Sequence, residues 1–256
     1  MVREAAPSDI PRLVDIDLAC FDDVYADSPP SRTEVADMLS DRLRAAGRLM
    51  IVGSVEGRVE GFMTCQVTDK KPEDFVDWET TTDNGHITKT HDPKGDSFYI
   101  VNMTVTPQGT ESNVGDMLIA NMYGRFIEDR KNTAQLLSRI PNFSKWLSEH
   151  EIDFTNLSEA EQDVLAEEYT REKKRNEKGK EVLYDGMLRR YGYAGAKPVK
   201  VVRDGFKDPV SQDYGVLCVV DNPLPAVVRR SKIASSIVGK ALQAVSQKPS
   251  IVGKIF

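Results

Sequence analysis

The stretch that decides the fold is SFYIVNMTVTPQGTESNVGDMLIANMY, residues 97–123. Its first part, residues 97–105, is apolar and β-branched, which predicts a buried strand. A polar loop follows, and beyond it the apolar residues recur at helical spacing. The first amides of a helix have no partner within the helix, so a loop that leads into one can hold an anion. The same pattern also fits an ordinary helix start.

The composition is that of a folded protein of one substantial domain, with 40% hydrophobic and 29% charged residues in 256. No apolar run approaches the roughly 20 residues of a membrane span, and MVREAAPSDIP does not resemble a signal peptide. Cys20, Cys65 and Cys218 lie far apart, which predicts reduced core thiols in a cytoplasmic protein. His86 and His91 lie in a polar segment and are expected to be exposed, so no metal is expected.

Charge is unevenly distributed along the chain. Residues 226–256 carry six basic side chains and no acidic one. Because the net charge of the whole chain is −6, residues 1–225 sum to −12. An acidic body of this kind does not favour nucleic-acid binding, which needs a basic face.

The order of elements along the chain predicts an α/β (α+β) fold with a mixed, mostly antiparallel twisted sheet and helices on both faces. Residues 2–21 predict a strand and a helix, with Ser8 as its cap and Pro11 in its first turn. A second helix (31–47) and a hairpin (48–68) follow. Residues 69–96 are expected to form a long polar loop, and residues 144–182 a charged, mostly helical insertion. A helix, a turn, two strands and a basic tail at 226–256 complete the chain.

Three segments resemble the GCN5-related N-acetyltransferase (GNAT) superfamily. VREAAPSDIPRLVDIDLACF is similar to its opening strand and helix, with the pattern R-x-A-x-x-x-D. NMTVTPQGTESNVGDMLIANM is similar to its acyl-CoA motif, and MLRRYGYAGAKPVKVV to its last helix and Gly-aromatic turn. A narrower likeness links SRIPNF, LYDGML and DYGVLCVVDNPL to acyltransferase domains fused to nitrilase-type carbon–nitrogen hydrolases. The resemblance covers residues 1–225, which are taken as one acyltransferase domain.

The resemblance implies an acyl-CoA cosubstrate, with acetyl-CoA as the simplest form. The main chain of Asn102 and of Met103, Thr104 and Val105 would line the pantetheine arm, and the sheet would split after Val105. The pyrophosphate would lie on the loop formed by Thr110, Asn113, Val114, Gly115 and Asp116.

This loop departs from the family pattern Gln/Arg-x-x-Gly-x-Gly/Ala. When the pattern is aligned on Gly115, Thr110 takes its first position and Asn113 replaces a glycine. Glu111 and Asp116 also add negative charge beside an anion site. In the alternative interpretation, Asn113 caps the helix and Asp116 completes a capping-box-like pair.

The residues that would serve as acid and base in the reaction also depart from the family pattern. Family members protonate the leaving thiolate with a tyrosine in the last helix, at the position that Leu188 occupies here. Tyr184, one turn earlier, and Tyr191 are the candidate acids, and each could also be a core side chain. Asp96 and Tyr99 are the candidate bases, and Asp96 could also be an exposed loop acid.

Arg139, at the end of a predicted strand, could bind a substrate carboxylate. An ion pair with the acidic helices that follow is an equal alternative for this side chain.

The leading hypothesis is an acyl-CoA-dependent N-acyltransferase acting on a small amine or amino-acid-like acceptor. The alternatives are a GNAT-like domain acting on a carrier-bound acyl thioester, by transfer or decarboxylation, and a binding module without turnover. Residues 69–96 and 144–182 are expected to flank the acceptor site.

In the tail, Ile233, Ile237, Ala241, Leu242 and Val245 share one helical face. Packing of this face on its own chain, on a second copy or on another protein is the first expectation, and contact with an anionic membrane the second.

Overall fold

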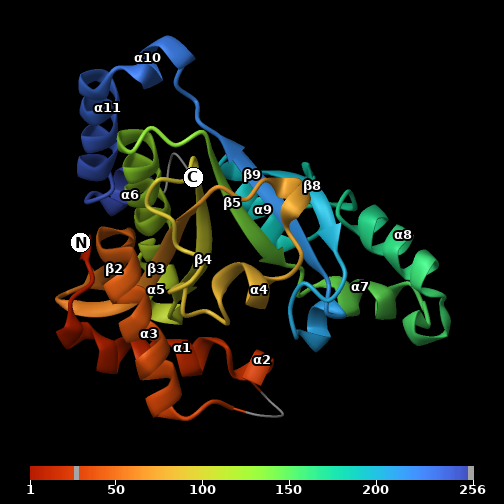
Figure 1. Ribbon diagram of the computed structural model, residues 1–256. Helices are drawn as coiled ribbons and strands as arrows, with labels where there is room; N and C mark the ends of the chain where they lie inside the picture. Colours follow the sequence, from red (N-terminus) through yellow and green to blue (C-terminus); the bar gives the residue numbers. More distant parts are fainter. Residues whose placement is uncertain (26–28, 253–256) are drawn as a thin grey trace. The chain divides into compact units, whose positions relative to one another are not determined.

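The computed structural model describes residues 1–25 and 29–252. The chain divides into two compact units (Figure 1). Unit 1 contains Met1–Lys70, Thr81–Ala134 and the segment that starts at Asp221, and unit 2 contains Lys71–Thr80 and Gln135–Val220. No helix in the described ranges is long and apolar enough to cross a membrane.

The strands of unit 1 follow the order β1 (Val2–Glu4), β2 (Met50–Val55), β3 (Arg58–Thr68) and β4 (Ser97–Val105), and the three pairs are antiparallel. Glu56 and Gly57, with φ of 49° and 85°, form the tight turn between β2 and β3. The predicted hairpin and the mostly antiparallel, mixed α/β fold are therefore confirmed.

Helices cover both faces of this part of the sheet. Helices α1 (Ile10–Cys20) and α3 (Arg32–Ala46) bury Leu13 and Leu39 against Phe62 of β3. Neighbouring residues of a strand point to opposite faces, so Gly61 faces the other side, where α6 (Val114–Glu128) lies. A Cβ on Gly53 would come within 2.6 Å of Val114, so the small residues of β2 and β3 let α6 approach closely.

The R-x-A-x-x-x-D pattern at the N-terminus is explained by an ion pair. Both guanidinium nitrogens of Arg3 donate to the Asp9 carboxylate at 2.7 Å, and the amide of Ala6 donates to it at 2.8 Å. These donors hold the pKa of Asp9 below its usual value. Ser8 lies in a 3₁₀ turn (Pro7–Asp9), and Asp9 occupies the N-cap position of α1. The prediction that Ser8 caps this helix is wrong.

Residues 69–96 form a packed connection rather than a long open loop. They contain a 3₁₀ turn (Pro72–Asp74) and α4 (Trp78–Thr82). Phe75 is buried in unit 2, and Thr82 and Ile87 are buried in unit 1. The polar sequence of residues 69–96 did not predict this packing. Polar groups in the segment form hydrogen bonds within the protein, such as the one that Gln66 Nε2 donates to the Thr81 carbonyl.

Unit 2 contains β5 (Thr133–Arg139), which begins in unit 1, and the antiparallel strands β8 (Lys197–Val202) and β9 (Gly215–Asp221), in the order β5-β9-β8. The predicted helical insertion consists of α7 (Phe143–Glu149) and α8 (Glu159–Tyr169), followed by α9 (Gly186–Tyr193). Between α8 and α9 lies a short hairpin, β6 (Lys173–Arg175) and β7 (Glu181–Leu183), which the charged sequence did not predict. The core of this unit is aromatic and contains Phe143, Trp146, Phe154, Tyr169 and Tyr214.

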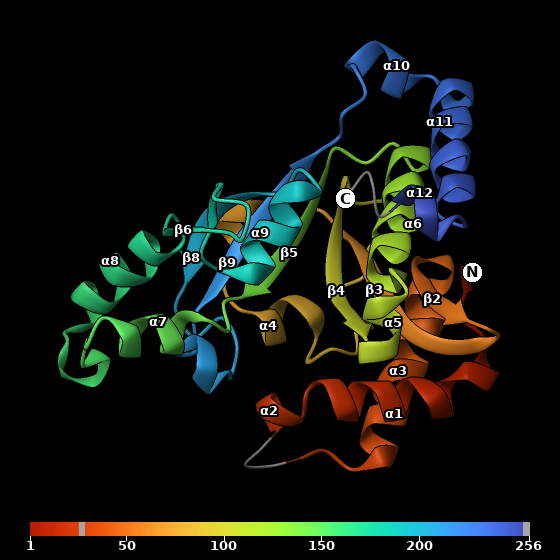
Figure 2. The ribbon, with the colours of Figure 1, turned by 180° about the vertical axis from the view of Figure 1, so that it is seen from behind.

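The tail forms α10 (Ala226–Arg230), α11 (Lys232–Val245) and α12 (Pro249–Val252), and residues 253–256 lie outside the described part. Helix α11 packs along α6, as both ribbon views show (Figures 1 and 2). The predicted packing of the tail on its own chain is thus observed. The prediction of which face of the helix makes the contact is wrong. Ser235 and Gly239 face α6, whereas Ile233 and Ile237 are 75% and 65% exposed.

Candidate active site

The segment after β4 is held rigidly in unit 1. It begins with the five-residue helix α5 (Pro107–Glu111), whose N-cap Thr106 accepts a bond from the amide of Gly109. Thr106 also donates its hydroxyl to Glu60 at 2.7 Å and its amide to the Glu60 carbonyl at 2.9 Å. Arg12 donates to the same carboxylate at 3.0 Å. The loop is therefore anchored from β3 and α1 and presents a fixed backbone.

Asn113 sets the geometry of the turn from α5 into α6. Its φ of 58° and ψ of 28° lie in the left-handed region, which glycine tolerates best and asparagine better than most other residues. Asn113 thus adopts a backbone conformation that a glycine at this position could also adopt. Its side chain makes no capping bond, so the interpretation of Asn113 as a side-chain cap is wrong.

The start of α6 offers main-chain donors in a protected position. Val114 and Gly115 are buried, whereas Asn113 is exposed and Asp116 is half-buried. The first amides of a helix cannot pair within it, and the helix dipole is positive at this end. Thr110 and Glu111 belong to α5 rather than to an open loop, and both are exposed.

We expect Asn113→Gly to preserve or raise the free energy of unfolding and Asn113→Ala to lower it by about 1 kcal/mol, because alanine is strained at positive φ. Urea denaturation of both variants checks this. An alanine variant as stable as the wild type would show that the turn is not left-handed in solution.

The strand that would line a pantetheine arm carries a bulge. Thr64 is opposite Asn102 and Cys65 is opposite Ile100, so Val101 is the extra residue of β4. A bulge sharpens the twist and re-aims the following side chains. Beyond it, Met103 and Val105 are half-buried and Thr104 is buried. The split of the sheet after Val105 stays a prediction.

A buried polar cluster that sequence reasoning missed lies beside the bulge. Arg42, from α3, is 2% exposed and donates to the Gly85 carbonyl at 2.5 Å and to Asn102 Oδ1 at 3.2 Å. Asn102 donates in turn to Thr104 at 3.0 Å, and within the described chain no hydrogen-bond partner is found for the buried Thr64 hydroxyl. The only sequence signal was Arg42 on the apolar face of its helix, three residues after Leu39.

The two candidate bases differ in position. Asp96 precedes β4 and is exposed, whereas Tyr99 is 1% exposed and pairs with Gln66 across the strands. At about 3.3 Å per residue, Asp96 lies roughly 16 Å along the strand from the bulge. A carboxylate at that distance cannot contact a group held at the bulge. Of the two candidate bases, Tyr99 is the one that lies close to the bulge along β4.

The candidate acids lie in unit 2, with different environments. Tyr184 precedes α9, so its predicted place one turn earlier in the helix is wrong, and its hydroxyl donates to Glu149 at 2.5 Å. Tyr191 lies within α9, where burial and nearby Cys218 raise its pKa to about 12. Leu188, at the family's tyrosine position, is buried and carries no proton donor.

Arg139 is already paired. Its Nε and Nη2 donate to the two Asp208 oxygens at 2.7 and 2.9 Å, and the Asp208 side chain is 1% exposed. The predicted ion pair is thus present, but with Asp208 in the connection before β9 rather than with the helices that follow. The carboxylate-binding role of Arg139 is not supported, because a bidentate partner occupies its guanidinium.

The cysteines and histidines have structural environments. Burial raises the pKa of Cys218 to about 12 and that of Cys65 further, as expected of inert core thiols, while Cys20 is half-buried. The two histidines are partly exposed and each has a partner: the His86 side chain is 38% exposed and its Nδ1 lies 2.8 Å from Asp41, and His91 is half-buried and its Nδ1 accepts the Val67 amide at 3.1 Å.

Comparison with known proteins agrees with this geometry. No family model matches the sequence. An uncharacterized N-acetyltransferase, YkwB of Bacillus subtilis (strain 168), is 28% identical over 221 residues, which cover 84% of this chain and 86% of that protein. A GNAT-like decarboxylase, GphF, in complex with isobutyryl-CoA superposes with a TM-score of 0.62 at 17% identity, covering 87% of this chain and 99% of that one.

The chain has the GNAT fold. The loading GNATL domain of CurA from Lyngbya majuscula superposes with a TM-score of 0.63 at 17% identity, over 87% of this chain and 97% of that one. The predicted GNAT resemblance of the chain is therefore confirmed, and the YkwB match supports the acyltransferase prediction. The narrower likeness to nitrilase-fused domains stays a prediction.

Proposed function

We propose that this protein is an acyl-CoA-dependent N-acyltransferase acting on a small amine or amino-acid-like acceptor. The observation that carries the proposal is the left-handed Asn113, which turns the chain sharply into α6 so that the first amides of this helix begin directly after the turn, where an anion could bind. The relative named N-acetyltransferase supports the reaction class.

In this proposal the main chain does most of the donor binding. The pyrophosphate would lie on the first amides of α6, where backbone donors and the helix dipole favour an anion. The pantetheine arm would pair with Met103–Val105 like an added strand. CoA supplies the activated acyl group as a thioester; the acceptor nitrogen would form the new C–N bond as the C–S bond breaks. The thiolate would take up a proton to match the one that the acceptor nitrogen gives up, and the role of Tyr191 as the acid stays a prediction.

The test is binding of CoA and of pantetheine, followed by turnover of acetyl-CoA with a panel of amines. Calorimetry should show tighter binding of CoA than of pantetheine, because only CoA has the pyrophosphate. Free thiol should then appear with acetyl-CoA only when a suitable amine is present. Equal affinities for both ligands would remove the pyrophosphate site from the proposal.

Glu111 provides a sharper prediction, because its carboxylate lies at the end of α5, next to the turn into α6. We expect Glu111→Gln to tighten CoA binding about two- to fivefold by removing like charge beside the pyrophosphate, with pantetheine binding unchanged. Calorimetry at low salt measures both. Glu177→Gln, at an exposed position in the β6–β7 turn of unit 2, is the matched control. An equal gain for pantetheine would contradict the placement.

A second candidate function is decarboxylation or loading of a carrier-bound acyl thioester. Two structural neighbours, a GNAT-like decarboxylase and a loading GNATL domain, favour it. Acidic Glu111 would disfavour a pyrophosphate there, and a carrier-borne pantetheine has none. Release of CO₂ from a malonyl thioester without an added amine would support this function over N-acylation.

A further inference from the structure

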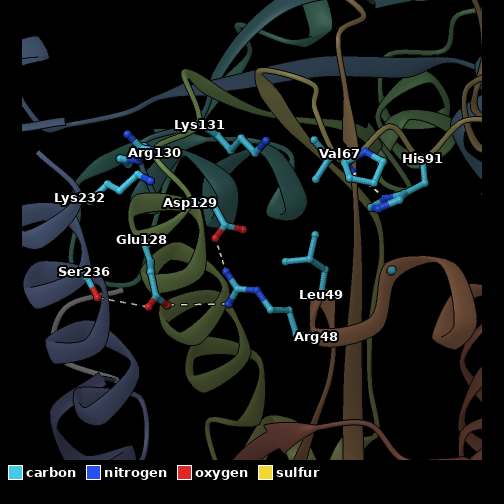
Figure 3. A pocket seen from close by; sticks show the side chains of 12 residues that line it. Arg48, Leu49, Val67, His91, Glu128, Asp129, Arg130, Lys131, Lys232 and Ser236 are labelled. Atoms are coloured by element: carbon cyan, nitrogen blue, oxygen red, sulfur yellow. Dashed lines mark hydrogen bonds and ion pairs between the residues drawn. The ribbon is translucent and has the colours of Figure 1, made fainter. Parts of the chain in front are cut away.

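A hollow with a basic rim lies at the C-terminal end of α6. It is a cavity of about 540 Å³ lined from five places in unit 1: the end of α3 and the following turn, Val67 of β3, the segment around His91, the end of α6 with the turn after it, and α11 (Figure 3). Helix α6 has 15 residues, so at 1.5 Å per residue the cavity lies roughly 20 Å from Asn113. It is therefore separate from the proposed acyl-CoA site.

The charges that line this cavity are unbalanced. Two acidic residues, Glu128 and Asp129, face four basic ones: Arg48, Arg130, Lys131 and Lys232. Arg48 pairs with both acids, and Glu128 also accepts bonds from Gln243 at 2.9 Å and Ser236 at 3.4 Å. The acids are thus held by internal partners. Within the described chain, no ion pair or side-chain hydrogen bond engages Arg130 or Lys232, and Lys131 donates only to the Gly95 carbonyl.

His91 adds a neutral donor to the same cavity. Its Nδ1 accepts the Val67 amide, so the ring hydrogen is on Nε2 in the neutral form. Burial also lowers the pKa of His91, which keeps the ring neutral near pH 7. The site thus combines three cations with one uncharged N–H donor.

Arg130 is placed by an unusual backbone. Helix α6 ends in a Schellman-type turn, in which the amide of Lys131 donates to the Phe126 carbonyl and that of Arg130 to Ile127. Arg130 occupies the position that usually requires glycine and has a φ of 57°. Cations near a helix C-terminus interact favourably with its dipole, which could explain Arg130 and Lys131. The dipole of α6 does not explain why Lys232, which belongs to α11, also lines the cavity. It does not explain the presence of the cavity either.

We propose that this cavity binds a small polyanion that carries phosphate or carboxylate groups. Arg130, Lys131 and Lys232 would neutralise its charge, and the His91 Nε2–H would donate to an oxygen. A bound anion would join α11 to the end of α6, because Lys232 and Ser236 form one wall and Arg130 and Lys131 another. The tail helix would then be the element whose docking the ligand stabilises.

Pyrophosphate and citrate are the probes, compared with chloride at equal ionic strength in thermal shift and calorimetry on the full chain. We expect at least one of them to raise the melting temperature and to bind with measurable heat. Arg130→Gly should weaken that binding about tenfold or more, since a charge-assisted contact is lost. The same variant should fold at least as well as the wild type, because glycine relieves the positive φ.

Matched variants separate this site from the acyl-CoA site. Lys232→Gln should weaken the polyanion, whereas Lys178→Gln, in an exposed turn of unit 2, should not. Asn113→Ala, at the other end of α6, should leave the affinity for the polyanion unchanged, whether or not it changes the affinity for CoA. Stronger binding of pyrophosphate than of citrate assigns a phosphate ligand, and the reverse a carboxylate. No response beyond chloride, or unchanged binding in Arg130→Gly, overturns the proposal.

Discussion

Replacing Arg139 with leucine should lower the free energy of unfolding by about 3–5 kcal/mol. The variant leaves the Asp208 carboxylate, whose side chain is 1% exposed, without its bidentate partner. Of the side chains in the described part of the protein that donate to Asp208, the Ser211 hydroxyl at 2.5 Å would remain. Urea denaturation followed by the fluorescence of Trp146, which lies in the aromatic core of the same unit, measures the loss.

Two controls make this result specific. Lys145→Ala removes an exposed ion pair with Glu149 and should cost no more than about 1 kcal/mol. Arg139→Lys keeps the charge but not the paired geometry and should fall between the two. A stable Arg139→Lys variant with a raised KM for a carboxylate-bearing acceptor would instead restore the substrate-binding role that the sequence allowed.

The second large effect is expected at Gly239, where α11 crosses α6. A Cβ there would lie 2.5 Å from the Gly124 carbonyl oxygen and 3.0 Å from the Glu128 amide nitrogen, both backbone atoms that cannot rotate away. Gly239→Leu should therefore separate the helices and destabilise the docked tail by about 1–3 kcal/mol, despite the better helix propensity of leucine. Limited proteolysis should then cut the segment around α10 faster.

Ala241→Leu is the matched control, because this position is exposed on the same helix and the added side chain enters solvent. Its proteolysis should resemble that of the wild type. If Gly239→Leu is cut no faster than Ala241→Leu, α11 does not dock on α6 through its glycine. Gly239→Leu should also abolish the polyanion response, since α11 carries Lys232.

Much of the fold could be predicted because its signals are local. Apolar, β-branched runs identify β2, β3 and β4, and helical spacing identifies α3 and α6. The face of α11 could not be predicted, since periodicity sorts residues by hydrophobicity. The contact with α6 is instead limited by how closely two backbones approach, which selects serine and glycine.

The site was only partly predictable for a similar reason. The strand β4 and the helix α6 on either side of Asn113 follow from local sequence, so this part of the fold was predicted, and its role in binding the acyl donor stays a proposal. The partner of Arg139 is 69 residues away, and Arg42 meets Asn102 at a separation of 60. Nothing in a single sequence pairs such residues. Helix α6 was predicted from its start, but the basic cavity at its end depends on α3, the His91 segment and α11 coming together.

The left-handed residue at position 113 changes what counts as a conservative exchange. By side-chain volume and polarity, asparagine and glycine are poor substitutes for one another, and serine or alanine would rank as milder replacements. Here the left-handed backbone is expected to accept glycine in place of asparagine and to be strained by alanine. A sequence pattern that requires glycine at this position does not detect the loop. A pattern that requires a left-handed residue at this position does. Distant acyltransferases with the same substitution would be recognised by that second kind of description.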